Sequence, residues 1–470
     1  MNAAIATSDP RATAAGVELL AAGASAMDAA AAAALVLYVV EPQQCGPGGD
    51  GFLIHVAPGA DPVAIDGSGE LPLGLTDEAL AAAGLDTVPA RGAASVTVPG
   101  ALRLLEHGLA TFGTRSFAEV MTSAVRHATE GFEVRPTLAS ASTRAAAEIG
   151  ADPVLGPLYV PDGRPLEVGD IVRNPVLAQV LTMVGEEGTG VLHGGALGAA
   201  VAARVRAGGG FLTDDDMAAH RSVPMTPVSS PFRGSTVWEL PAPTQGPAVL
   251  ETLRRVEAAV DSVDDWRVVI DAMREGMTAA GFDLARIGVR PSPARGDTTY
   301  IAAIDSAGRA ASLITSVFGD FGSHFGIPEL GAPMGNRATM LRALGRPMDP
   351  GAKPPHTTIP AAVTRDGRLQ YVLGVAGGFM QPQAQVQILI QLLERGLAPQ
   401  AAIDEPRFRL GFGGVLSLEP GHALCAEMPE EAARPPGPEG YGAAQVAGVV
   451  AGRVVAGADH RRNGVAIVID

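Results

Sequence analysis

Lysine is almost absent from this chain of 470 residues: Lys353 is the only one, and all the other strongly basic side chains are arginine. A phosphate-binding loop of the Walker type needs a Gly-Lys pair, and Lys353 follows Ala352, so that class of nucleotide-binding protein is excluded. Acidic residues outnumber basic ones and give a net charge of −16, which argues against a broad surface for nucleic acid. Small molecules or proteins are the expected partners.

Cysteine and long apolar runs are also scarce. Cys45 and Cys425 have neither the spacing nor the neighbours of a disulfide scaffold or a zinc site, so two inert thiols and no metal are expected. The most apolar run, residues 29–40, is shorter than the roughly 20 residues that cross a bilayer and predicts a buried helix. No basic segment followed by an apolar one opens the chain, which favours a cytoplasmic protein with no membrane partner.

The composition is otherwise that of a protein with a large core, 47% hydrophobic and 18% charged. Helical patterns dominate up to residue 280, and strand patterns follow, with one further helix at 382–396. Helices followed by packed strands predict one layered α/β domain that spans the chain. Gly46, Gly48 and Gly51 match the spacing of a dinucleotide-binding loop, but they follow a helix and precede a strand, which is the reverse order. They predict a tight turn and no cofactor.

Thr298 has the setting that an N-terminal nucleophile requires. It opens a predicted strand directly after a loop rich in proline and glycine at 281–297, and Asp297 precedes it. Cleavage of the Asp297–Thr298 bond would give Thr298 a free α-amine, whose ordinary pKa of about 7.7–8.0 suits a general base at neutral pH. One residue would then supply both the nucleophile and the base.

Many short motifs in the chain occur in the same order in a known family. They include ATSDP at 6–10, VPG at 98–100, NPVL at 174–177, PAPTQG at 241–246, GDTT at 296–299, PPHTTIP at 354–360 and GG at 377–378. With them the chain resembles the γ-glutamyltransferase family of self-cleaving N-terminal-nucleophile hydrolases. The resemblance implies an αββα four-layer fold and no cofactor. It also implies self-cleavage into a large fragment, residues 1–297, and a small fragment, residues 298–470, which stay together.

The same resemblance assigns catalytic roles. Thr298 matches the nucleophile, and Ser316 matches the hydroxyl residue that hydrogen-bonds it and assists processing. Gly377 and Gly378 match the glycine pair whose backbone N–H groups form the oxyanion hole. Thr357 falls where the family has a polar residue that lines the acyl site.

Two positions that bind glutamate in the family differ here. Ser68 stands where the arginine that binds the α-carboxylate is expected, and Met340 stands where the aspartate that holds the α-ammonium is expected. Phe318 replaces an asparagine near the nucleophile. Because a site loses an ionic substrate when its charged partners are removed, glutathione is a poor candidate.

Other residues near these motifs are candidates for binding a substrate. Asn336 and Arg337 begin the altered motif, and Arg337 is a cation that could bind a carboxylate from another direction or form a surface salt bridge. His324 and His356 flank the other site motifs, although a lone histidine is often structural.

The sequence therefore predicts a self-cleaving hydrolase that attacks an acyl amide of a small carboxylate-bearing metabolite. One alternative is hydrolysis of a C–C bond with loss of an oxalyl-type group, as in homologues from 4-alkyl-proline antibiotic pathways. The others are a true γ-glutamyl transpeptidase and a binding protein without catalysis.

Overall fold

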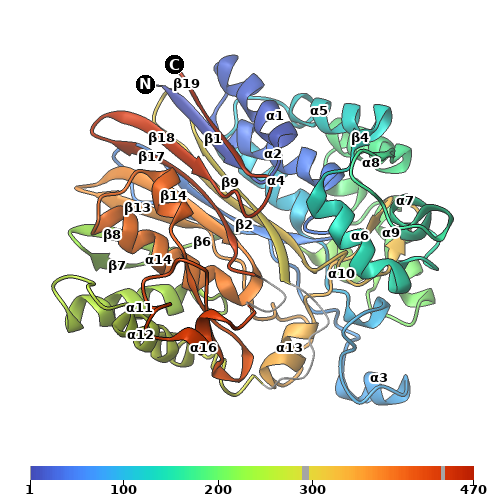
Figure 1. The fold of residues 1–470 in the computed structure, drawn as a ribbon. Coiled ribbons are helices and arrows are strands. Elements are labelled where there is room, and N and C mark those ends of the chain that lie inside the picture. Colours follow the sequence, from blue (N-terminus) through green and yellow to red (C-terminus); the bar gives the residue numbers. More distant parts are fainter. Residues whose placement is uncertain (1, 288–295, 436–439) are drawn as a thin grey trace.

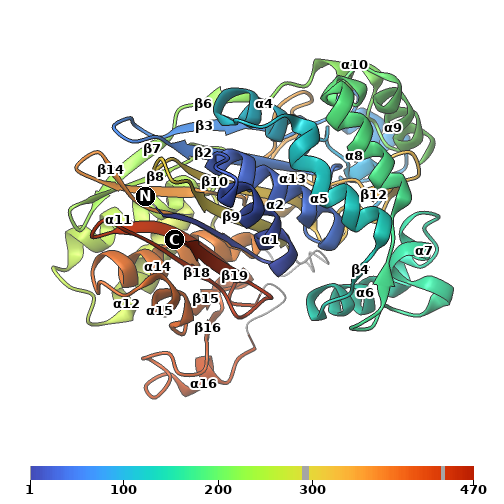
Figure 2. The same ribbon diagram turned by 90° about the horizontal axis from the view of Figure 1, so that it is seen from above.

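In the computed structural model, which describes residues 2–287, 296–435 and 440–470, two β-sheets pack face to face between two layers of helices (Figures 1 and 2). The predicted αββα four-layer arrangement is confirmed. Apolar side chains from both sheets, among them Phe52, Tyr300 and Val372, fill the space between them. The two ends of the chain lie side by side, because the first strand pairs with the last (Figure 1).

The first sheet is antiparallel throughout and has seven strands, in the order β19-β1-β9-β10-β2-β3-β6. Their bounds are β1 (Ala3–Thr7), β2 (Asp50–Val56), β3 (Val63–Asp66), β6 (Val223–Met225), β9 (Gly296–Ile304), β10 (Ala310–Gly319) and β19 (Val465–Ile469). The two central strands, β9 and β10, are buried along the part whose side chains are described. They position the candidate nucleophile.

The second sheet is also antiparallel and has the order β18-β17-β14-β13-β8-β7. Its strands are β7 (Val228–Phe232), β8 (Ser235–Glu239), β13 (Ala361–Arg365), β14 (Arg368–Ala376), β17 (Ala443–Val450) and β18 (Arg453–Ala458). Three short pairs lie outside both sheets: β4 (Phe132–Glu133) with β5 (Ile171–Val172), β11 (Gly326–Ile327) with β12 (Ala332–Pro333), and β15 (Phe408–Leu410) with β16 (Leu416–Leu418).

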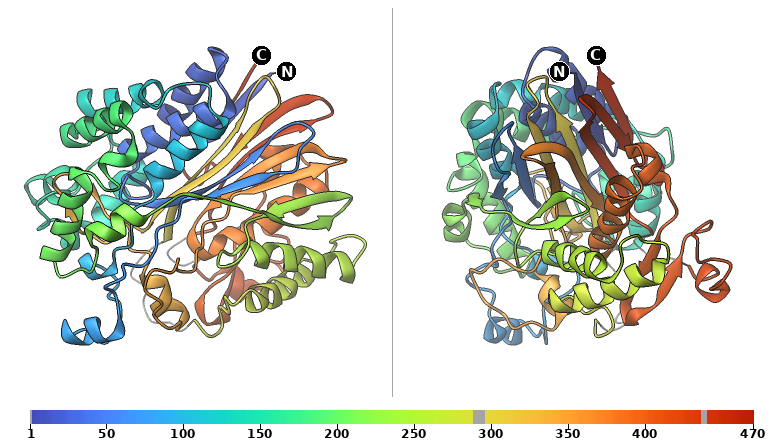
Figure 3. Two further views of the ribbon diagram at one scale, coloured as in Figure 1. Left: turned by 180° about the vertical axis from the view of Figure 1, so that it is seen from behind. Right: turned by 90° about the vertical axis from the view of Figure 1, so that its left-hand side faces the viewer.

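Most helices of the first half of the chain lie on the outer side of the first sheet, some against its strands and the others packed on those helices (Figure 3). They are α1 (Pro10–Ala21), α2 (Ala26–Val40), α4 (Ala101–Phe112), α5 (Phe117–Glu130), α6 (Pro136–Ile149), α7 (Leu155–Tyr159), α8 (Pro175–Glu187), α9 (Ala196–Ala207) and α10 (Asp214–Ala219). Every residue of α2 is buried, as the apolar run predicts. Ser25 and Asp28 cap its start reciprocally, which satisfies backbone N–H groups that no helical carbonyl reaches.

The second helical layer covers the other sheet and contains a helix with an unusual buried face. Its helices are α11 (Gly246–Ala259), α12 (Trp266–Ala279), α14 (Gln381–Leu393) and α15 (Pro399–Asp404), and three short helices lie elsewhere: α3 (Asp77–Ala82), α13 (Thr339–Leu344) and α16 (Pro429–Ala432). In α14, the side-chain amides of Gln383 and Gln387 each bond both backbone groups of one residue of β15, Leu410 and Phe408 respectively. Buried glutamines are stable here because the amides satisfy backbone that β16 leaves unpaired.

One predicted boundary was wrong. β9 begins at Gly296, so Thr298 is the third residue of its strand and not the first. The reason is that Gly296 and Asp297 already pair with β10, opposite Gly319 and Phe318. The rest of the predicted loop, from residue 288 to 295, lies outside the described residues, as does the side chain of Asp297.

Two expected absences concern thiols and membranes. Cys45 is buried and Cys425 is partly buried, and the two thiols do not form a disulfide with each other. Among the helices that the structure describes, none is both long enough and apolar enough to span a membrane.

Candidate active site

Thr298 faces a β-bulge. Ser316 and Val317 of β10 both lie opposite Thr298, whereas the pairs on either side of it are one to one. The backbone N–H of Val317 donates instead to the carbonyl of Gln44 at 3.0 Å, and its carbonyl accepts from the N–H of Asn336 at 3.2 Å. The bulge is thus held by segments from outside the sheet, and it brings Ser316 next to Thr298.

The two hydroxyl groups are in contact and enclosed. Thr298 Oγ1 donates to Ser316 Oγ at 3.2 Å, and Ser316 Oγ accepts from the backbone N–H of Phe318 at 2.9 Å. Both residues are only 1% exposed. This geometry points the threonine hydroxyl at a single acceptor and excludes bulk water from it.

A polar network supports the strand on the other side of the nucleophile. The carbonyl of Thr298 accepts from Arg462 Nη1 at 3.3 Å. Ser8 Oγ donates to Glu41 at 2.6 Å, so Thr299 Oγ1 is the donor in its 2.7 Å contact with Ser8. These bonds fasten the backbone that follows the Thr298 side chain.

Gly377 and Gly378 form a turn that ends β14. Their φ angles are 135° and 53°, which L-residues with side chains rarely adopt. The short 3₁₀-helix η4 (Gly378–Met380) that follows packs against β9. No described residue accepts a hydrogen bond from the backbone N–H of either glycine, so the two donors are available to a ligand.

Arg337 is fully buried beside the bulge at Ser316 and is not a surface residue. Its Nε and Nη2 donate to the two carboxylate oxygens of Asp50 at 3.1 Å and 2.9 Å, and its guanidinium lies 4.7 Å from the center of the Phe318 ring. Asp50 is directly opposite Ser316 in the sheet, which places the ion pair beside the bulge. The remaining nitrogen, Nη1, lies 3.5 Å from Thr357 Oγ1.

His356 closes the same region. Its Nε2 lies 3.7 Å from Asp50 Oδ2, its Nδ1 lies 3.1 Å from Thr358 Oγ1, and its ring stands edge-on to Phe52. Burial, together with the charges of Arg337 and Lys353, holds the pKa of His356 well below its ordinary value. The ring is therefore neutral at physiological pH.

Asn336 and Ser68 are engaged by their own neighbours. Asn336 Oδ1 accepts from the N–H of Gly319 at 3.0 Å, and its Nδ2 donates to a carbonyl at 2.9 Å, so the side chain fixes the backbone after Phe318. Ser68 Oγ donates to Asp66 at 2.6 Å. It adds no charge to the site.

His324 lies in a separate group of contacts. Its Nε2 approaches the carbonyl of Asp320 at 2.9 Å, and its Nδ1 lies 2.8 Å from Glu148 of α6. Burial and the charge of Arg91 lower the pKa of His324 to about 3. No contact in the structure joins it to Thr298.

Lys353 lies beside the segment that carries Ser68, a position that the sequence alone did not predict. Its Nζ lies 3.0 Å from Asp66 Oδ2, in the segment that carries Ser68. The signal was present, since this is the chain's only lysine, but it served only to exclude other chemistries.

The glycine loop at 46–51 is a packing feature, as the reversed order of its neighbours predicts. A Cβ at Gly49 would lie 2.3 Å from the carbonyl oxygen of Ser316. We therefore expect Gly49→Ala to displace the bulge and to reduce self-cleavage and hydrolysis by at least about ten-fold, measured by the fraction of cleaved chain and by kcat/KM. Gly190→Ala, at a position with open space around it, is the matched control. Full activity in Gly49→Ala would show that the bulge does not position Ser316.

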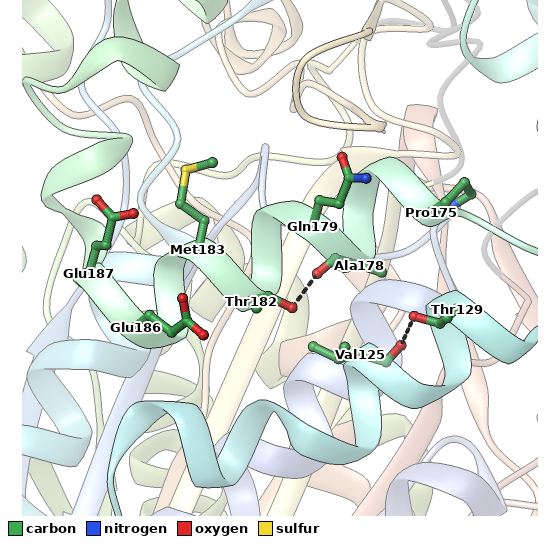
Figure 4. Close-up of a pocket in the computed structure, with 9 residues that line it drawn as sticks. All are labelled: Val125, Thr129, Pro175, Ala178, Gln179, Thr182, Met183, Glu186 and Glu187. Atoms are coloured by element: carbon green, nitrogen blue, oxygen red, sulfur yellow. Dashed lines mark hydrogen bonds between the residues drawn. The ribbon is translucent and has the colours of Figure 1, made fainter.

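A groove on the outer helical layer is unrelated to this site. It lies between α5 and α8 and includes Thr129, Gln179 and Met183 (Figure 4). None of its residues is among those described above.

The fold and comparisons with known proteins define the class. The four layers are those of N-terminal-nucleophile hydrolases. A crystal structure of cephalosporin acylase from Bacillus halodurans aligns over 99% of this chain and 95% of its own, with a TM-score of 0.88 and 30% identity. The family model of gamma-glutamyltranspeptidase matches residues 12–285 and 278–469.

The chain belongs to the gamma-glutamyltranspeptidase family and is a hydrolase. An oxamate amidohydrolase proenzyme of Klebsiella pneumoniae is 30% identical over 438 residues, which cover 83% of this chain and 81% of that protein. A glutathione hydrolase-like proenzyme of Bacillus subtilis, YwrD, is 28% identical over 436 residues, covering 84% and 83%.

Proposed function

We propose that this protein is a self-cleaving amide hydrolase that acts on a small carboxylate-bearing acyl group and does not act on glutathione. The observation that carries the proposal is the buried contact between Thr298, the third residue of β9, and Ser316 of β10. The names of two similar proteins, an acylase and an oxamate amidohydrolase, support an amide substrate. Oxamate is itself a small amide that carries a carboxylate.

Self-cleavage would begin with attack of Thr298 Oγ1 on the carbonyl carbon of Asp297. Ser316 Oγ, which accepts the hydrogen bond from the Thr298 hydroxyl, would take that proton while it gives its own proton to the leaving nitrogen of Thr298. The ester that results is hydrolysed by water, which gives residues 1–297 and residues 298–470. Both sheets combine strands from the two parts: β2 pairs with β10 in the first sheet, and β8 pairs with β13 in the second. The fragments are therefore expected to remain one folded unit.

Hydrolysis of the substrate would then use the new α-amine of Thr298. The amine takes the hydroxyl proton as Oγ1 attacks the substrate carbonyl, and the same proton goes to the departing amine. The N–H groups of Gly377 and Gly378, which no described residue uses, would hold the negative oxygen, a role worth about 2.7–4 kcal/mol for one donor. Water releases the acyl group and regenerates the hydroxyl.

The charges around the site support a substrate without an α-ammonium group. Met340 is completely buried in an apolar cluster, so no anion is present at that position to hold an ammonium. Phe318, Arg337 and Thr357 would form the wall of the acyl pocket, with neutral His356 behind them. Two of the nitrogens of Arg337 are already used by Asp50, which leaves Nη1 to contact a substrate.

Two chromogenic amides test this specificity. Glutaryl-p-nitroanilide and γ-glutamyl-p-nitroanilide differ only in the α-ammonium group. We expect a kcat/KM at least about ten-fold higher for the glutaryl compound, because the ammonium would be desolvated without a partner. Equal or better turnover of the γ-glutamyl compound would contradict the assignment. If an added amino acid acceptor outcompeted water, the protein would be a transpeptidase.

Hydrolysis of a C–C bond is the alternative that uses the same nucleophile. The missing charge at Ser68 and Met340 suits it equally, since neither reaction needs a glutamate site. An oxalyl-bearing β-dicarbonyl compound in the same assay separates the two, because it releases a carbon acid and no amine. Turnover of that compound, with both anilides inert, would replace the amide proposal.

A further inference from the structure

The only lysine of the chain is enclosed among acidic groups at the end of β3. Lys353 Nζ lies 3.0 Å from Asp66 Oδ2 and 3.9 Å from Glu70 Oε1, and it is buried although the side chain as a whole is 21% exposed. Neither approach has the geometry of a hydrogen bond, and no other described residue accepts one from Nζ. An ammonium group has three N–H donors, so this one has donors to spare in a place that water does not reach.

The two carboxylates do not depend on the lysine. Asp66 Oδ1 accepts from the backbone N–H and the hydroxyl of Ser68 at 2.7 Å and 2.6 Å. Glu70 Oε2 lies 2.7 Å from His220 Nδ1. Both anions therefore keep partners when Lys353 turns toward another acceptor.

A structural ion pair does not by itself explain why a lysine stands here. Apart from Lys353, the chain uses only arginine for a side chain of this charge. Arginine pairs with carboxylates at least as well as lysine does, because its donors match both oxygens. An ammonium differs in being a compact point charge that fits a narrow space and can reorient toward a small anion.

The place of Lys353 connects it to the acyl pocket. His356 and Thr357 follow it in the same segment, and the charge of Lys353 contributes to the low pKa of His356. The backbone before the lysine is fastened to the segment that carries Ser68, since Leu71 and the pair Gly351 and Ala352 exchange two hydrogen bonds at 2.9 Å. A cation is thus held beside the segment that carries Ser68, which itself provides none.

We propose that Lys353 Nζ binds the carboxylate of the substrate's acyl group, with Arg337 confined by Asp50 to a supporting role. The inference rests on the proposed amide hydrolase function and names the residue that selects its substrates. The ligand class is a small acyl amide with a terminal carboxylate.

Kinetics of Lys353→Met test the role in substrate selection. With glutaryl-p-nitroanilide, we expect KM to rise at least about ten-fold, which corresponds to the loss of one charge-assisted hydrogen bond. We expect kcat to change less than about three-fold. With the neutral pentanoyl-p-nitroanilide, the rise in KM should be absent. Arg368→Met, which removes an exposed positive charge at the start of β14, is the control. Equal losses on both anilides, or no change with the glutaryl compound, would overturn the proposal.

A second measurement does not depend on turnover. In protein grown with ¹³C-lysine, Lys353 gives the only lysine Cε signal. We expect this signal to shift and saturate on titration with glutarate and to stay in place with pentanol. No shift at saturating glutarate would overturn the carboxylate site. A shift in a protein that hydrolyses neither anilide would leave the anion site standing and refute the hydrolase proposal instead.

Discussion

A Thr298→Ala variant is expected to remain one uncleaved chain and to lose amide hydrolysis by more than about 10⁴-fold. The hydroxyl of Thr298 donates to Ser316 in the buried bulge, and in the proposed mechanism it attacks twice, first the chain and then the substrate. Denaturing gel electrophoresis reports the first event, and release of p-nitroaniline from glutaryl-p-nitroanilide reports the second.

The conservative variant Thr298→Ser separates chemistry from folding. Serine keeps the hydroxyl and lacks only a methyl group, so this variant should still cleave itself and hydrolyse the anilide, at reduced rates. If Thr298→Ala hydrolysed the anilide at the wild-type rate, another residue would be the nucleophile. If both variants failed and also unfolded, the loss would be structural, which thermal melting would show.

Removal of one partner of the buried pair Asp50–Arg337 is expected to lower the free energy of unfolding by about 3–5 kcal/mol. Both side chains are at most 4% exposed, so Arg337→Met leaves an unpaired carboxylate and Asp50→Asn leaves an unpaired guanidinium away from water. The double variant removes both charges and should be more stable than the sum of the single losses predicts. Urea denaturation of the four proteins measures this coupling.

An exposed ion pair serves as the control for that cycle. Glu251 and Arg254 in α11 lie 2.7 Å apart near the surface, and their removal should cost less than about 1 kcal/mol. Single losses at Asp50 and Arg337 of that smaller size would contradict the view that the pair is buried and holds the bulge. The same variants should lose hydrolysis, because Asp50 lies opposite Ser316.

Much of the fold was predictable because apolar periodicity and glycine placement are local signals. The alanine-rich run at 29–40 lies inside α2, and the glycines at 46–51 form close backbone contacts, as their order along the chain indicates. The start of β9 was not predictable, since Gly296 and Asp297 join the strand only through pairing with β10. Such pairing depends on residues distant in the sequence.

The candidate site shows the same division. Motifs identified Thr298, Ser316 and the two glycines, and the structure places Ser316 against Thr298 and the turn that carries the glycines beside β9. The environment of Arg337 could not be predicted, because its partner Asp50 is on a strand that only the folded sheet brings near. The surroundings of Lys353 could not be predicted for the same reason, because its neighbours Asp66 and Glu70 lie far away in the sequence.

The intact mass of the purified wild-type protein, before and after a brief reaction with glutaryl-p-nitroanilide quenched in acid, tests the central claim most directly. The account predicts two fragments, residues 1–297 and 298–470. It also predicts a glutaryl adduct on Thr298, the first residue of the second fragment, and no such adduct in Thr298→Ala. A single species of 47.7 kDa, without cleavage or adduct, would contradict it.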